Sequence, residues 1–270
     1  MIAISLIGAL AALVATRASQ APVAPVSLVP EFVVVRPGTA FHVAVHISLP
    51  DSWHIGWQNP GQSGLATTID WRVSPRISAG QTAWPFPERA ETIGTVSHIY
   101  RGEVIIVSAF ELRADTGSGP LELVATVRWG ICREICIPQE REVRISIPTG
   151  SGPPEPSPAW NALAGTIATQ LPARPADIGL MVHRTRDGIR VSRAGGAGSL
   201  PPIAGALVFF PEAKSRRALA AVVTARATTT GMSIPIPGAP GATLHGVLVA
   251  EHSWGPGAPR ALLIDLPGRP

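Results

Sequence analysis

Hydrophobic and polar residues alternate over much of this chain, and a period of two is the pattern of a half-buried strand. Residues 42–47, which read His-Val-Ala-Val-His-Ile, show this alternation. Short strands separated by turn signals, with no helical period between them, predict an all-β, antiparallel sandwich. The turn signals lie at 59–61, 78–80 and 116–120. Strands are predicted in the first half at 32–35, 42–47, 67–73, 103–112, 121–129 and 140–147.

A proline-rich segment divides the chain. Residues 148–158 contain five prolines and no periodicity, which predicts a linker at 149–158. The linker separates a domain at 30–148 from a second β-rich domain at 159–270. Because proline-rich linkers mark domain boundaries, we expect few contacts to cross this one.

The second half contains one predicted helix, at 159–171, followed by further strands. The helix is indicated by a single apolar stripe of Trp160, Leu163, Ile167 and Leu171. The strands after it predict a second, smaller β-sandwich. They lie at 206–210, 221–227, 233–236, 244–250 and 261–266.

The first 21 residues have the features of a signal peptide. Residues 2–15 form an apolar run, and Ser19-Gln20-Ala21 is typical of a cleavage site. The alternative is an uncleaved anchor helix, although the run is short for a bilayer. Membrane contact is expected only through such an uncleaved segment. Either interpretation places the body of the protein outside the cytoplasm, in the periplasm of a Gram-negative cell, where cysteines can be oxidised.

Composition excludes several classes of protein. With 46% hydrophobic and 15% charged residues among 270, the chain is too apolar to be disordered. The net charge is +4, but the arginines are scattered and no zinc-finger, helix-turn-helix or RNA-binding motif is present. We therefore expect no nucleic acid among the partners.

The only two cysteines, Cys132 and Cys136, lie between two predicted strands. A hairpin there would bring them within the Cα separation of about 4.4–6.8 Å that a disulfide needs. A ring this small stabilises the fold by only about 2 kcal/mol, whereas a short exposed disulfide is accessible to a partner thiolate. We therefore expect Cys132 and Cys136 to be a catalytic pair that performs thiol–disulfide exchange.

Two other interpretations of the cysteines remain open. The pair could be a structural disulfide in a non-catalytic binding module. It could also bind copper(I), which soft thiolates select, with His54 and His98 as further ligands. Two cysteines are a weak metal signal, and nothing in the spacing places these histidines near them. We therefore expect no metal and no cofactor.

Several separated motifs resemble the N-terminal periplasmic domain of thiol:disulfide interchange proteins of the DsbD and ScsB type. The resemblance covers about residues 30–148, and the second half more loosely resembles the second extracytoplasmic domain of the ScsB-like branch. In the first half the motifs are the Trp-His-Ile-Gly-Trp-Gln-Asn-Pro-Gly-Gln-Ser-Gly of 53–64, Ile-Asp-Trp at 69–71, Trp-Pro-Phe-Pro-Glu-Arg at 84–89, Tyr-Arg-Gly-Glu at 100–103 and the cysteine segment 129–138. In the second half they are Leu-Val-Phe-Phe-Pro at 207–211 and Leu-His-Gly-Val-Leu-Val at 244–249.

This resemblance implies an immunoglobulin-like domain whose cysteines relay electrons to periplasmic partners. The expected partners are a membrane thiol-reductase and thioredoxin-like proteins, in a process related to cytochrome c biogenesis or copper tolerance. Family proteins also carry a membrane electron-transfer domain and a thioredoxin-like domain, which these 270 residues lack. We therefore expect a separate membrane protein to reduce the pair, with this chain a component of a protein-disulfide reductase system. The alternatives are that the chain is an isolated redox carrier or that it has lost the redox function.

The resemblance also implies roles for single residues. The second cysteine of the family pair bonds the partner, and that position is Cys136, which makes Cys132 the resolving cysteine. A loop in the family covers the cysteines, and its counterpart here is the region 84–100. The sequence departs from the classical pattern in its closer C-x3-C spacing. Arg133 beside Cys132 favours a thiolate at that sulfur instead, and Glu134 opposes it.

Overall fold

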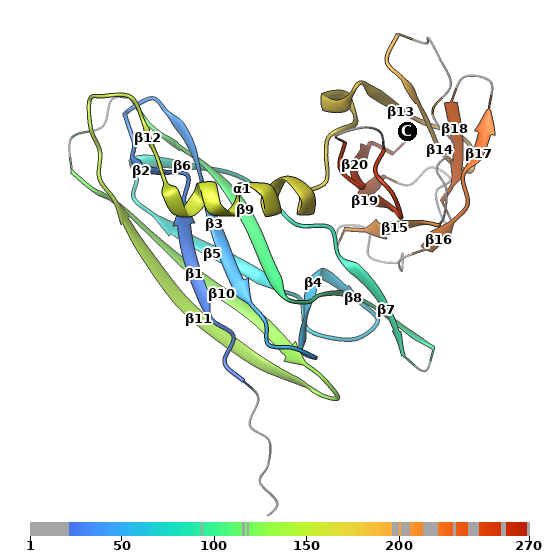
Figure 1. Cartoon of the computed structure of the whole chain (residues 1–270), viewed down its shortest axis with the longest axis horizontal. Coiled ribbons are helices and arrows are strands. Elements are labelled where there is room, and N and C mark those ends of the chain that lie inside the picture. Colours follow the sequence, from blue (N-terminus) through green and yellow to red (C-terminus); the bar gives the residue numbers. More distant parts are fainter. Residues whose placement is uncertain are drawn as a thin grey trace, which may run out of the picture.

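The first domain is a sandwich of two antiparallel sheets, as the alternation predicts (Figure 1). The computed structural model describes residues 22–92, 94–114, 117, 119–195, 200, 206–212, 221–228, 231–236, 243–254 and 258–268. One sheet has the order β1 (Val26–Pro30), β3 (Ala40–Ser48), β9 (Glu103–Leu112) and β6 (Ile77–Ala83). The other has the order β11 (Cys136–Ile147), β10 (Leu121–Cys132), β4 (His54–Gly61), β8 (Thr95–Tyr100) and β7 (Glu88–Thr92), with β5 (Thr68–Val73) also paired to β10.

Strand β10 shows how the period of two builds the core. Every second residue is buried, and its neighbours in sequence are more exposed over most of the strand. Trp57 of β4 and Phe41 of β3 are also fully buried in this first domain. The buried residues of β10 that alternate in this way are Leu121, Leu123, Ala125, Val127, Trp129 and Ile131.

Helix α1 (Pro158–Gln170) covers the outer face of the first sheet (Figure 1). It begins at Ser157, whose side chain accepts a hydrogen bond from the backbone N–H of Trp160. The predicted stripe of Trp160, Leu163, Ile167 and Leu171 packs on buried residues of β1, β3 and β9. This sheet is therefore covered on both faces. Within the described residues no helix is long and apolar enough to cross a membrane.

The proline-rich segment lies along the first domain. Strand β12 (Glu155–Pro156) pairs with β2 (Phe32–Val34), and Thr149 forms a bridge with Val35. The backbone N–H of Ser157 donates to the carbonyl oxygen of Glu31 at 2.9 Å. These backbone contacts hold the segment against the first sandwich before α1 begins.

The second domain contains two four-stranded sheets around a separate core, which agrees with the predicted β-rich second half. Its elements begin with the 3-10 helix η1 (Pro175–Ile178). One sheet has the order β13 (Leu180–Arg184), β14 (Gly188–Arg193), β18 (Gly231–Pro235) and β17 (Arg226–Thr228). The other has the order β16 (Ala221–Val223), β15 (Leu207–Pro211), β19 (Leu244–Ala250) and β20 (Ala261–Leu266).

The two domains share one apolar cluster, whereas the proline-rich linker predicted few contacts between them. Phe210 of β15 packs edge-on against Trp57 of β4 and His98 of β8, with ring centroids 6.3 and 5.3 Å apart. Asn59 donates a hydrogen bond from Nδ2 to the carbonyl oxygen of Pro211 at 2.6 Å. More contacts therefore cross between the domains than the sequence predicted.

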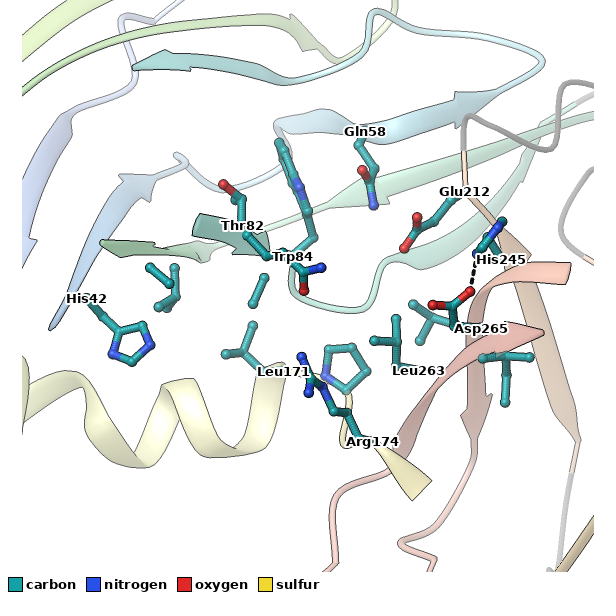
Figure 2. Close-up of a pocket in the computed structure, with 17 residues that line it drawn as sticks. His42, Gln58, Thr82, Trp84, Leu171, Arg174, Glu212, His245, Leu263 and Asp265 are labelled. Carbon is teal, nitrogen blue, oxygen red and sulfur yellow. Dashed lines mark ion pairs between the residues drawn. The ribbon is translucent and has the colours of Figure 1, made fainter. Parts of the chain in front are cut away.

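A cavity of about 540 Å³ lies beside this contact (Figure 2). Trp84 from the first domain lines it, as do Arg174, Glu212 and the ion pair between His245 and Asp265 from the second half of the chain. The ion pair joins His245 Nδ1 to Asp265 Oδ1 at 2.6 Å.

Several elements differ from the prediction. The turn signals at 59–61 and 78–80 lie inside β4 and β6, where each strand has an irregular register. In β6 the strand can continue through this turn signal because residue 80 is glycine: a Cβ at Gly80 would lie 3.2 Å from Ala109 of the neighbouring strand β9. Strands not predicted from the sequence are β1, β4, β6, β7, β8, β12, β13 and β14.

Candidate functional site

The two cysteines close the hairpin of β10 and β11. The strands pair in unbroken register from Leu121 opposite Ile147 to Cys132 opposite Cys136. A disulfide joins Cys132 and Cys136, whose Cα atoms are 4.1 Å apart. The predicted hairpin and disulfide-compatible placement are therefore confirmed, although the Cα separation is slightly below the expected range. The catalytic role of the pair remains a prediction.

The two sulfur-bearing residues differ in accessibility. Cys132 is buried, with 3% of its surface exposed, because it lies between two neighbouring strands. Cys136 is only half-buried because β11 is the edge strand of its sheet. An attacking thiolate can therefore reach Cys136 more readily than Cys132.

Residues 133–135 form the turn between the cysteines and are exposed. The side chain of Ile135 is 70% exposed, an unusual position for a large apolar residue. Arg133 places its guanidinium over the ring of Trp53, 5.3 Å from the ring centroid, in a cation–π arrangement. The turn therefore exposes the apolar side chain of Ile135, and the positive charge of Arg133 lies over the ring of Trp53.

His54 of β4 is the cross-strand partner of Cys132. Burial lowers the pKa of His54 below its ordinary value, and the charge of Arg101 lowers it further. The imidazole is therefore neutral at pH 7 and can accept a proton. Sequence reasoning considered His54 only as a copper ligand and did not place it beside the cysteines.

His98 lies elsewhere, in the contact between the two domains. It is fully buried, and a hydrogen bond of 2.7 Å joins its Nδ1 to the carbonyl oxygen of Asn59. Burial lowers its pKa, the hydrogen bond to Asn59 raises it in part, and Arg89 lowers it. In the described part of the chain, no group of three or more His, Cys, Asp or Glu side chains is arranged to hold a metal ion.

An apolar groove of about 420 Å³ lies beside the disulfide on the same hairpin. Leu65, which is 42% exposed, covers Gly130 of β10 so closely that a Cβ at Gly130 would lie 2.8 Å from the Cβ of Leu65. Arg128, one of the lining residues, pairs with Asp70 and Glu140. The residues that line the groove are Leu65, Ala66, Thr68, Arg128, Trp129, Pro138, Gln139 and Glu140.

The region 84–100 is the counterpart of the family loop that covers the cysteines, according to the resemblance. In the structure this region begins at the contact between the two domains. The backbone N–H of Phe86 donates to the carbonyl oxygen of Gln170 at 3.0 Å, and the guanidinium of Arg260 lies 5.9 Å from its ring centroid. Trp84 lines the cavity between the domains. The tryptophan that contacts the cysteine turn is Trp53, because the guanidinium of Arg133 lies over its ring.

The residues beside the cysteine hairpin whose position the sequence did not predict are His54, Trp53 and Leu65. All three belong to, or directly follow, the motif at 53–64. His54 lies beside Cys132 because β4 pairs with β10, and this pairing joins segments that are far apart in the sequence. The signal available was the presence of a histidine and two tryptophans in a motif that contains no cysteine.

Residues 21–147 match the family described as thiol:disulfide interchange protein DsbD, N-terminal. The crystal structure of the N-terminal periplasmic domain of ScsB from Proteus mirabilis is similar in fold, with a TM-score of 0.53 and 14% identity, over 90% of this chain and 92% of that chain. No curated protein matches the chain.

Two solved structures from Neisseria meningitidis align with part of the chain at a TM-score of 0.26. The reduced DsbD N-terminal domain is 23% identical over 48% of this chain and 91% of that chain. The complex between the DsbD and PilB N-terminal domains matches at 20% identity over 43% of this chain and 79% of that chain.

Proposed function

Because residues 21–147 belong to the DsbD N-terminal domain family, we propose that this chain performs thiol–disulfide exchange through Cys132 and Cys136. The observation that carries the proposal is the placement of the disulfide at the end of a hairpin, with Cys136 half-buried on an edge strand and Cys132 buried behind it. A disulfide between directly opposite neighbours staples little of the fold, which favours a redox role over a structural one.

In this function Cys136 is the partner-facing sulfur and Cys132 is the resolving one. A partner thiolate attacks Cys136, breaks the Cys132–Cys136 bond and forms a mixed disulfide, which a second partner thiol then resolves. Two electrons pass from the partner to the pair. In the reverse direction Cys136 attacks an oxidised partner, Cys132 resolves the mixed disulfide, and two electrons pass to that partner. The exposed Ile135 and the half-buried Ile137 support docking beside Cys136.

The proposed setting is the periplasm, with residues 1–21 as the signal peptide. That segment lies outside the described residues. A separate membrane thiol-reductase reduces the pair, and thioredoxin-like proteins receive the electrons. The complex of a DsbD N-terminal domain with the PilB N-terminal domain from Neisseria meningitidis is a pairing of the kind proposed. The proposed units are the redox domain at 30–148, the linker at 149–158 and the second domain at 159–270.

Trapping of a mixed disulfide tests the proposal. A Cys132→Ser variant keeps the partner-facing thiol and lacks the resolving one, so it should accumulate a covalent complex with a thioredoxin-like partner on a non-reducing gel. The matched Cys136→Ser variant should form little complex. Trapping in the Cys136→Ser variant alone would reverse the two roles, and the absence of trapping in both would count against the relay.

The reduction potential of the pair separates exchange from a structural bond. Structural disulfides have potentials below about −300 mV, and exchanging pairs have higher ones. Equilibration of the full chain with a glutathione redox buffer, followed by alkylation of free thiols, measures this value. A potential below about −300 mV would favour the structural interpretation.

A further inference from the structure

Cys136, Cys132 and His54 occupy one row across three neighbouring strands. Cys136 of β11 pairs with Cys132 of β10, and Cys132 pairs with His54 of β4. Directly opposite residues of antiparallel strands point to the same face and have Cβ atoms about 4.5–5.5 Å apart. His54 is therefore a direct side-chain neighbour of the resolving sulfur.

The adjacent row confirms which way these side chains point. Ile137, Ile131 and Ile55 pair across the same three strands, one position further along. Ile131 and Ile55 are fully buried, and Ile137 packs against the same apolar core. Because successive residues of a strand point to opposite faces, Cys132 and His54 lie together on the face away from that core.

We propose that His54 is the general base that takes the proton from the Cys132 thiol when Cys132 resolves the mixed disulfide on Cys136. The proposal rests on the proposed function and adds a residue to it. His54 is half-buried and shares its row with both cysteines, and no other histidine pairs with Cys132 in the described sheet.

The step balances without a further reactant. The reduced pair meets an oxidised protein disulfide, and Cys136 thiolate attacks it, forming a mixed disulfide and releasing one partner thiolate. His54 then accepts the proton of the Cys132 thiol, and the resulting thiolate attacks Cys136 Sγ. The Cys132–Cys136 bond forms, the bond to the partner breaks, and the departing partner thiolate takes the proton from His54. Two electrons have moved from the pair to the partner.

The charges around His54 suit a base that is neutral before the step. Burial and the charge of Arg101 both disfavour the imidazolium. Arg101 is itself paired with Glu88 at 2.6 Å. In the turn between the cysteines, the guanidinium of Arg133 lies over the ring of Trp53, and Glu134 is exposed. A neutral imidazole accepts a proton, and in this setting the imidazolium returns it readily to the leaving thiolate.

A small aromatic disulfide tests this step without a protein partner. The reduced full chain reacts with 5,5′-dithiobis(2-nitrobenzoate) in two phases: attack by the first thiol, which depends on reagent concentration, and closure of the pair, which does not. His54→Gln should slow the second phase about tenfold or more at pH 7, since general bases contribute about 10²–10⁴-fold in enzymes. The first phase should be unchanged, because Cys136 performs it.

Three further measurements separate a base from a structural residue. The rate of closure against pH should lose its histidine-dependent rise in His54→Gln and become that of an unassisted thiol. Free imidazole should restore part of the rate in His54→Ala, which keeps the test valid if the glutamine variant folds poorly. The matched control His183→Gln, an exposed histidine of the second domain, should behave as wild type.

The outcomes distinguish this proposal from the proposed function. Closure in His54→Gln at the wild-type rate and with the wild-type pH profile overturns the role of His54, whatever the trapping experiment shows. Slow closure in the variant supports that role even where no partner is trapped, because the reagent replaces the partner. A wild-type chain that never closes its disulfide overturns both.

Discussion

Asn59 in β4 donates a hydrogen bond from Nδ2 to the carbonyl oxygen of Pro211 in β15, and these residues belong to different domains. The same asparagine accepts a hydrogen bond from the backbone N–H of Gly61 and offers its carbonyl oxygen to His98. Its strand begins at His54, the neighbour of Cys132. One strand therefore carries both the contact between the domains and the residue beside the disulfide.

Replacing Asn59 by alanine should weaken the protein by about 1–3 kcal/mol, because the carbonyl oxygen of Pro211 would lose its partner in a partly buried contact. Urea unfolding at neutral pH measures the change in the free energy of unfolding. Asn161→Ala, at an exposed position of α1, is the matched control and should have little effect. Equal stability of the two variants would show that this hydrogen bond contributes nothing.

Reduction of the disulfide should leave the chain folded. The ring closed by Cys132 and Cys136 contributes about 2 kcal/mol by chain entropy, whereas the domain has a large apolar core. Thermal melts with and without a strong reductant should both be cooperative and differ by several degrees. The Cys132→Ser, Cys136→Ser double variant should melt like the reduced protein. Loss of the cooperative transition on reduction would indicate a structural disulfide.

Acid should weaken the domain contact through His98. Burial holds the pKa of His98 below the ordinary 6.5, so the folded protein binds the proton less readily than the unfolded chain. The stability that His98 contributes is therefore complete above about pH 6.5 and is lost as the pH falls below that value. Urea unfolding at pH 8 and pH 5 should show a smaller loss in His98→Gln than in wild type. A loss of the same size in both proteins would contradict this role.

Gly130→Ala should displace Leu65 from the hairpin. The added Cβ would lie 2.8 Å from the Cβ of Leu65, so the segment around Leu65 must move, at a cost of about 1–3 kcal/mol. Gly165→Ala is the matched control, because a Cβ at this helical position meets no atom within 4 Å and should stabilise α1. Chemical denaturation of both variants tests the contrast, and destabilisation of similar size in the two would argue against the close approach.

Local patterns predicted the elements that carry a clear period. The alternation in β10 and the stripe of α1 follow directly from the positions of their apolar residues, and both are observed. Strand β7, which reads Glu-Arg-Ala-Glu-Thr, has no apolar face to detect, since it is an edge strand with charged side chains. Strand β4 was hidden by the turn signal of Asn59 to Gly61, which its register irregularity accommodates.

The candidate site likewise has one part that the sequence predicted and one part that it did not. Cys132 and Cys136 lie on one hairpin, so their sequence spacing was sufficient to predict their pairing. His54 reaches Cys132 only through the pairing of β4 with β10, a contact between distant segments that no local pattern specifies. The shared domain cluster was missed for the same reason, because Trp57 and Phe210 are apolar in the sequence whether they face one domain or two.

The unbroken register of β10 and β11 determines where this chain can change its length. A single residue inserted into β10 would turn every later side chain of that strand to the opposite face. Cys132, the last residue of β10, would then point toward the apolar core, away from Cys136 Sγ and from His54. Residues added before Leu121 or in the turn at residues 133–135 leave the strand between Leu121 and Cys132 unchanged and are therefore compatible with the disulfide.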